Sequence, residues 1–174
     1  MRPTTSFSTA ALLACFLAQA SPLVAQNAQA PPQQAQASRQ DAVANRGDHV
    51  MGFSHDAATH HFHLLRDGGE ILVTANDVKD KSSVAEIRMH LSHIVGMFSD
   101  GNFTAPMLIH DTNPPGVATM TRLRSQIRYE LSETDRGAKI RIFTSSPETT
   151  DAVHAFLLFQ IVDHHTGDAP TIGS

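Results

Sequence analysis

Histidine is the residue type through which this chain could do most of its chemistry. The sequence holds eleven histidines, all at or after His49, and one cysteine, Cys15. An imidazole ring binds zinc, copper, nickel or iron through a neutral nitrogen, and a metal site normally needs three or four converging ligands. Because Cys15 lies in a predicted leader, we expect a folded domain without thiolate ligands, thiolate nucleophiles or disulfides.

Three of the histidines lie within four residues, in the stretch HHFHLL that begins at His60. Successive side chains of a strand point to opposite faces of the sheet. His60 is therefore predicted to share the inward face with Phe62 and Leu64, while His61 and His63 point outward. A regular strand cannot bring all three to one ion. Two geometries are open: His60 with the pair His90 and His93 of a predicted helix, or His61 with His63 as a separate surface clamp.

A second group of candidate ligands lies in EIRMHLSHIVGMF, residues 86–98. His90, His93 and Met97 fall on one stripe of a predicted helix, beside its core-facing residues. The stripe offers two imidazoles and a soft thioether to a metal. The ordinary alternative for such a histidine pair is a solvated or hydrogen-bonded helix edge.

Two further histidines stand outside these groups. His110 ends the apolar segment PMLIH and precedes Asp111, which could orient its ring. His164 lies on the core side of a predicted helix near its C-terminus, where the helix dipole stabilises a protonated ring as readily as a metal holds a neutral one. We predict that the metal ligands are a subset of the following residues: His60, His61, His90, His93, His110 and Met97.

The available ligand types rank the metals. The predicted domain has five methionines beside its histidines and no cysteine, which favours copper, then zinc, with haem iron as a third alternative. The sequence has no C-x-x-C-H stretch, so covalent c-type haem is excluded. It also lacks H-E-x-x-H, the helical motif of zinc proteases.

The elements that must position these residues form two similar halves. Residues 61–77 predict a hairpin with its turn at Asp67-Gly68-Gly69, and residues 126–146 predict a second with its turn at Asp135-Arg136-Gly137. Apolar residues at helical spacing then predict one helix over about residues 84–98 and another over about residues 151–165.

These patterns predict an α+β fold. We expect an antiparallel sheet built from the two hairpins, with two helices packed on one face, and interpret it as a degenerate duplication of a strand-strand-helix unit. A short apolar segment over residues 106–110 and a helical turn near Thr119 are predicted between the two halves.

The N-terminal residues predict export from the cytoplasm. Residues 1–25 combine one positive charge, a short apolar run and a candidate cleavage site at Ala18-Gln19-Ala20, as in a signal peptide. Lipidation at Cys15 is an alternative. The apolar run is too short to span a bilayer, so we expect a periplasmic or secreted protein with no transmembrane segment in the mature chain.

The remainder divides into three predicted parts. Residues 26–45, rich in Ala and Gln, predict a flexible linker. Residues 46–168 predict a single α+β domain, and residues 169–174 a C-terminal tail.

Five stretches of this domain resemble a known family. They are VMGFSHDAATHHF, DGGEILVTANDV, EIRMHLSHIVGMF, PMLIHDTNPPGV and FLLFQIVDHHTGD. Together they resemble a family of small exported bacterial His-rich proteins of unassigned function, over essentially the whole mature domain. Some members carry the label aspartate carbamoyltransferase. The resemblance brings no carbamoyl-phosphate loop, since no S-T-R-T stretch occurs, and it implies domain boundaries but no site residues.

The net charge bears on two further functional classes, nucleic-acid binding and pH-dependent binding. The formal net charge is −4 with histidines neutral, and no basic run occurs, so we expect no nucleic-acid partner. Protonation of the eleven histidines would make the chain positive.

We therefore predict a periplasmic transition-metal-binding protein that sequesters, delivers or senses its ion. The main alternative is a cell-envelope module that binds a ligand or a protein partner through a pH-responsive histidine surface. A third interpretation is an enzyme with His60 or the His110-Asp111 pair as general base, which requires a cleft beside that residue.

Overall fold

The structure is a computed structural model that describes residues 32–52 and 54–173. The chain divides into a unit of residues 1–30 and a unit of residues 31–174. The first unit holds the predicted signal peptide and the start of the predicted linker, which lie outside the described residues. The second unit contains the following elements in chain order: α1 (Pro32–Met51), the 3-10 helix η1 (His55–Ala57), β1 (Ala58–Leu65), β2 (Gly68–Ala75), α2 (Lys81–Ser99), α3 (Thr104–His110), α4 (Val117–Arg122), the 3-10 helix η2 (Arg124–Gln126), β3 (Ile127–Thr134), β4 (Gly137–Thr144) and α5 (Pro147–His164).

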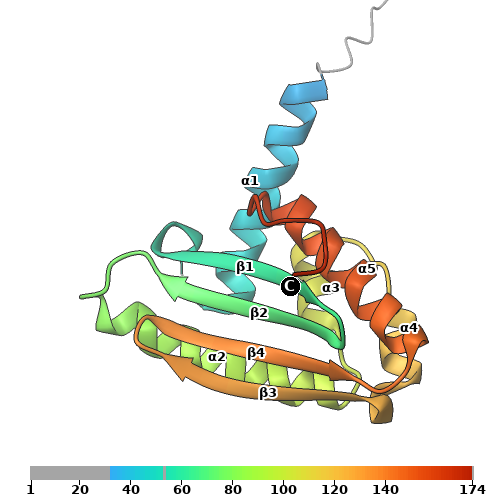
Figure 1. Ribbon diagram of the computed structural model, residues 1–174. Helices are drawn as coiled ribbons and strands as arrows, with labels where there is room; N and C mark the ends of the chain where they lie inside the picture. Colours follow the sequence, from blue (N-terminus) through green and yellow to red (C-terminus); the bar gives the residue numbers. More distant parts are fainter. Residues whose placement is uncertain (1–31, 53, 174) are drawn as a thin grey trace, which may run out of the picture. The chain divides into compact units, whose positions relative to one another are not determined.

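The strands form one antiparallel sheet in the order β1-β2-β4-β3 (Figure 1). Both predicted hairpins are confirmed, and each has a glycine at the start of its second strand, Gly68 and Gly137. Their φ angles are +135° and +159°, and an added Cβ would lie 2.1 Å from the carbonyl oxygen of Ile142 and 2.2 Å from that of Val73. Only glycine fits such a close backbone approach. The two hairpins therefore meet in the same way at equivalent positions, which agrees with a duplicated unit.

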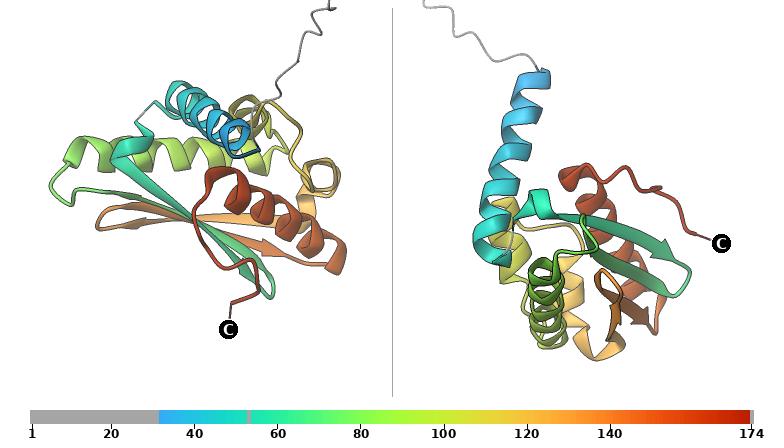
Figure 2. Two further views of the ribbon diagram at one scale, coloured as in Figure 1. Left: turned by 90° about the horizontal axis from the view of Figure 1, so that it is seen from above. Right: turned by 90° about the vertical axis from the view of Figure 1, so that its left-hand side faces the viewer.

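The two predicted helices, α2 and α5, lie on one face of the sheet, as the left view in Figure 2 shows. Helix α2 follows the first hairpin but packs mainly on β3 and β4, whereas α5 follows the second hairpin and packs mainly on β1 and β2. Each half therefore covers the hairpin of the other. This arrangement confirms the predicted α+β fold and explains why neither half buries its apolar face alone.

Capping side chains define where both helices begin. At α2, the Asp80 side chain accepts a hydrogen bond from the Ser83 N–H. At α5, Ser146 and Thr149 form a reciprocal capping box, and Pro147 is the first helical residue. Such caps satisfy backbone N–H groups that have no partner within the helix. They hold fixed the two helices that carry His90 and His164.

Helix α1 differs from the flexible linker predicted for residues 26–45. Residues 32–45 are helical, and residues 26–31 lie outside the described part of the chain. Alanine, glutamine and arginine are good helix formers, and tertiary contacts supply what local propensity does not. Val43 and Met51 are 2% and 8% exposed, and the Arg46 Nε–H donates to the Ile109 carbonyl at 2.7 Å. The apolar contacts of α1 are few and widely spaced, so composition alone concealed them.

The segment after α5 returns to the edge strand β1. The Asp168 carboxylate accepts a hydrogen bond from the Phe62 N–H at 2.8 Å, and the Gly173 N–H donates to the Leu64 carbonyl at 2.9 Å. An edge strand presents unpaired backbone groups, and a covering segment satisfies some of them. The predicted C-terminal tail, residues 169–174, is therefore part of the folded unit as far as Gly173.

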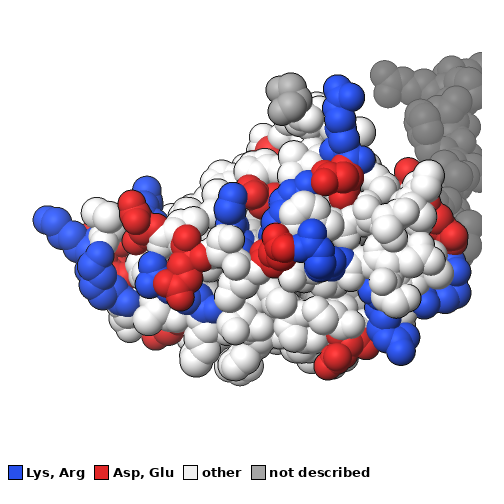
Figure 3. Space-filling model, turned by 60° about the horizontal axis from the view of Figure 1, so that its bottom comes forward, with Lys and Arg blue, Asp and Glu red and all other residues white. Residues whose placement is uncertain are grey.

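Basic and acidic side chains are intermingled on the face shown in Figure 3. The prediction of no nucleic-acid partner rests on the sequence, and this face adds no basic patch to weigh against it. Among the described residues, none of the helices combines the length and apolar character needed to cross a membrane.

Candidate metal centre

The pleat of β1 separates the clustered histidines as predicted. Phe62 and Leu64 are each 4% exposed and belong to the core. His60 has the same parity and faces the helices, while His61 and His63 stand on the opposite, solvent-facing side of the sheet. The stretch therefore contributes to two separate environments.

On the helix side, four histidines from four elements line one small cavity of about 60 Å³. His60 comes from β1, His90 from α2, His110 from α3 and His164 from α5. Met51, the last residue of α1, also lines this cavity. The rest of the wall is mainly apolar, so the cavity combines several imidazoles with apolar side chains.

Ring contacts link these histidines. The rings of His60 and His164 are stacked, with centroids 5.5 Å apart. The rings of His110 and His164 meet edge to face at 4.9 Å. His90 lies near enough to His60 to lower its pKa electrostatically. The four side chains therefore form one interacting group, which we call the buried histidine cluster. His110 is fully buried, and His60, His90 and His164 are partly exposed.

Burial makes three of these rings poor bases. It lowers the pKa of His60 and that of His90 to about 4 and the pKa of His164 to about 3, against an ordinary value of 6.5. Neighbouring histidines add to each shift, because a second positive charge nearby is unfavourable. For His164, burial outweighs the nearby charge of Asp163, which acts to raise the pKa. All three rings are neutral at pH 7, the form that binds metals.

His110 is held by polar partners on both sides of its ring. It is fully buried, and its Nδ1 lies 2.6 Å from the Asp163 carboxylate. Arg39 donates to the same carboxylate at 2.7 Å. Burial tends to raise the pKa of Asp163, but the hydrogen bonds from Arg39 and His110 outweigh it and lower the pKa. An ionised carboxylate on Nδ1 fixes the orientation of the ring, as it does for histidines that bind metals through Nε2.

The other nitrogen of His110, Nε2, lies 2.9 Å from Oε1 of Gln160. Gln160 is 4% exposed, lines the same cavity, and has no hydrogen-bond partner for its Nε2 among the described residues. A buried amide donor without an acceptor is costly. With the amide turned over, its Nε2 would instead donate to Nε2 of His110.

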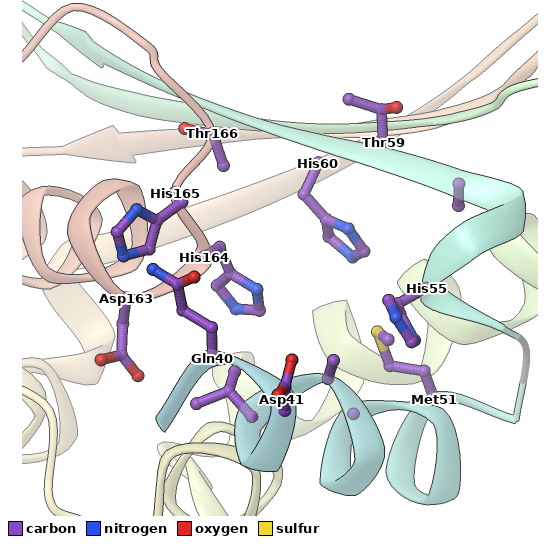
Figure 4. A pocket seen from close by; sticks show the side chains of 14 residues that line it. Gln40, Asp41, Met51, His55, Thr59, His60, Asp163, His164, His165 and Thr166 are labelled. Atoms are coloured by element: carbon purple, nitrogen blue, oxygen red, sulfur yellow. The ribbon is translucent and has the colours of Figure 1, made fainter. Parts of the chain in front are cut away.

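A larger cavity of about 390 Å³ opens beside the cluster, between α1, β1 and the end of α5 (Figure 4). His60, His164 and Met51 line both cavities. In Figure 4 the rings of His60 and His164 point into the opening, and Asp41 lies across from them on α1. A solute that entered this opening would meet the nitrogen-bearing rings of the cluster.

A second group of possible ligands lies on the outer face of β1. The ligand atoms of His61, His63 and Asp168 are all within 4.8 Å of one another, the closest such set among the described residues. The nitrogens of the buried histidine cluster are not gathered as tightly. The two environments therefore differ in both burial and present geometry.

The structure places the predicted ligands in different environments. His60, His90 and His110 meet in the buried histidine cluster, and His61 lies on the other face. His93 is exposed, and Met97 is half-buried against the core, outside the walls of this cavity.

Sequence reasoning left several residues of these sites out of the predicted ligand set. His164 was placed on the core side of its helix but was not included, although its spacing of three from Ile161 marked the inward stripe. Met51, Gln160 and Asp168 carried no local signal, because their places depend on how distant segments meet.

No model of a protein family, no curated protein and no solved structure matches this chain. The resemblance drawn from the sequence therefore stays a prediction, and the geometry alone carries the functional argument.

Proposed function

We propose that this protein binds a transition-metal ion through the buried histidine cluster, His60, His90, His110 and His164. The observation that carries the proposal is the convergence of four histidines, from four separate elements, on one small cavity. A fold has no structural need to bring four imidazoles into an otherwise apolar interior, since burying polar groups costs free energy.

The chemistry of the cluster suits a metal better than an organic cation or anion. Three of the rings are neutral at pH 7, and a neutral imidazole offers a lone pair to a metal without first losing a proton. For His110, the Asp163 carboxylate on Nδ1 would hold the ring with Nε2 as the metal-binding atom, provided that the Gln160 amide turns away.

The size of the small cavity suits an ion, while the adjoining cavity of about 390 Å³, which shares His60 and His164, leaves haem as the weaker alternative. A volume of about 60 Å³ holds an ion with one or two small ligands, whereas pockets for drug-sized molecules have volumes of roughly 300–1,000 Å³. Met51 supplies a thioether at the same wall. Imidazole with thioether favours copper, and imidazole alone also suits zinc.

The cluster would rearrange when it binds the ion. Its nitrogens are not all within 4.8 Å of one another, so rings must rotate to reach bond lengths near 2 Å. Rotation is feasible for His60 and His164, because they border the open cavity beside α1. That opening also supplies an access route, with Asp41 and Asp163 among its walls to attract a cation.

The biological role that we propose is sequestration, delivery or sensing of the ion outside the cytoplasm, as the N-terminal leader predicts. The alternative of a pH-responsive histidine surface predicts histidines spread over the exterior. Four of the eleven gather instead at one interior cavity, which favours metal binding.

Titration of the untagged protein with Cu²⁺ and Zn²⁺, followed by calorimetry and metal analysis, tests this proposal. We expect a tightly held equivalent that is lost in the His60→Ala, His164→Ala double variant. His93→Ala is the matched control, because His93 lies on α2 three residues from His90 but is exposed.

Circular dichroism would confirm that the variants fold. An unchanged stoichiometry and affinity in a folded double variant would overturn the proposal. So would an equal loss in the His93→Ala control, since that residue lies outside the cavity wall.

A further inference from the structure

The outer face of β1 carries a set of groups that the buried histidine cluster does not use. His61 and His63 stand two residues apart on this strand, and Asp168 reaches them from the segment after α5. Their ligand atoms lie within 4.8 Å of one another without any rearrangement. Two imidazoles and one carboxylate form a well-known ligand set for first-row divalent metals, with positions left open for water or substrate.

Asp168 is held in place from several directions. One carboxylate oxygen accepts from the Phe62 N–H at 2.8 Å, and the other lies 2.9 Å from Nδ1 of His61. Its side chain is only 9% exposed. Burial acts to raise the pKa of Asp168, but contacts with Thr166, Phe62 and His61 outweigh it and lower the pKa, so the group is ionised at neutral pH.

The two histidines are open to solvent on the same side. Their side chains are 36% and 44% exposed, and their rings are stacked nearly parallel, 6.2 Å apart. Nδ1 of His63 lies 3.4 Å from the Glu70 carboxylate, which Lys139 also contacts at 3.0 Å. A carboxylate beside a ligand histidine orients its ring and strengthens it as a donor.

We propose that His61, His63 and Asp168 form a second, surface metal site that binds a divalent ion of the zinc type and fixes the C-terminal segment against β1. Two of the three ligands come from the strand and the third from that segment, so the ion would connect them. The site is separate from the buried histidine cluster, which lies on the other face of the sheet. It can therefore exist whether or not the buried cluster binds metal.

Direct binding requires only a small change. Nδ1 of His61 and the Asp168 oxygen now lie at hydrogen-bond distance, 2.9 Å. Two ligand atoms at about 2.1 Å from a tetrahedral zinc ion are slightly farther apart than this. Zinc would thus replace the hydrogen bond between the two groups, and the N–H of the neutral His61 ring would move from Nδ1 to Nε2.

Zn²⁺ titration of the untagged full chain, with Co²⁺ as the coloured substitute, tests the site. The background for the test is the His60→Ala, His164→Ala variant, which removes two of the four histidines of the buried cluster. We expect this background to bind one Zn²⁺ and the added Asp168→Asn change to weaken binding at least about 10-fold. His49→Ala is the matched control, an exposed histidine on α1 that should leave binding unchanged.

Hydrogen exchange of residues 165–173 gives a second measurement. Zn²⁺ should slow exchange of this segment in the background protein, and should not do so after Asp168→Asn or His63→Ala. Binding that persists unchanged in both variants, or that appears only at millimolar Zn²⁺, overturns this site. If the unaltered protein binds a single Zn²⁺ that Asp168→Asn removes and that the His60→Ala, His164→Ala change does not weaken, only the proposed function is overturned, so the two failures are distinguishable.

Discussion

The two faces of β1 show how one strand gives neighbouring histidines different chemistry. His60, on the inner face, is surrounded by apolar residues and other histidines, and burial lowers its pKa to about 4. His61, one residue later, is open to solvent and paired with a carboxylate. Loss of hydration determines the pKa of the inner ring, whereas a neighbouring carboxylate determines the contacts of the outer one. The same residue type thus offers an uncharged ligand set on one face and an anionic one on the other.

The two faces of β1 should also differ in how they affect the free energy of unfolding. The buried histidine cluster removes polar rings from water, which costs free energy. Changes at this cluster should therefore have the largest effects on the free energy of unfolding of the metal-free protein. The outer site is solvated, and surface ion pairs contribute little to stability. Three measurements of the free energy of unfolding test whether the inner and outer groups differ in this way.

The largest expected effect is acid destabilisation of the metal-free protein. His60, His90 and His164 have pKa values near 4, 4 and 3 when folded and near 6.5 when unfolded, so the unfolded chain binds more protons between these values. Stability is present above pH 6.5 and is lost as the pH falls toward 4. Discounted for partial exposure, the free energy of unfolding should drop by roughly 4 kcal/mol between pH 7 and pH 5.

Other charges near the cluster enter this balance. Asp163 partly offsets the shift at His164, while His61 adds to the shift at His60 and His93 to that at His90. Urea denaturation in the presence of a chelator, repeated at several pH values, measures the slope. His164→Phe should reduce it by about one proton, and Val162→Phe, at an exposed position on the same helix, should not. A slope equal in all three proteins would contradict the assigned burial.

The next largest effect concerns His110. Replacing this fully buried ring by alanine leaves a cavity and removes a partner from Asp163 and from Gln160. We expect His110→Ala to lower the free energy of unfolding by about 3 kcal/mol at pH 7. Chemical denaturation measures this change. A loss below about 1 kcal/mol would mean that His110 does not anchor α3 to α5.

The sequence predicted well what depends on local pattern. The alternation in β1 separated His60 from His61 and His63, and apolar spacing located α2 and α5, because pleat and helical period are fixed by backbone geometry. The turn glycines Gly68 and Gly137 were visible for the same reason.

Features that depend on distant contacts escaped the sequence. Asp168 meets His61 across 107 residues, and no local pattern connects them. Helix α1 has little amphipathic character, and its buried anchor Val43 lies in a segment whose composition suggested a linker. Strand parity left open that His60 would meet His90 and His93. In the structure His60 lines one cavity with His90 and His110, while His93 is exposed, and only the packing of distant elements determines this.

The smallest expected effect on the free energy of unfolding is that of a change on the outer face of β1. In the presence of a chelator, His63→Ala should change the free energy of unfolding by less than about 0.5 kcal/mol, because the side chain is solvated and its contact with Glu70 is long. With Zn²⁺ added, the His60→Ala, His164→Ala background should gain stability in proportion to how far the ion exceeds its dissociation constant. The His63→Ala protein should not share this gain. Denaturation with and without Zn²⁺ measures both quantities, and His49→Ala again serves as the control. A large decrease in the free energy of unfolding of His63→Ala in the presence of a chelator would show that the outer histidines stabilise the fold without metal. The inner and outer faces would then not differ in their contribution to stability.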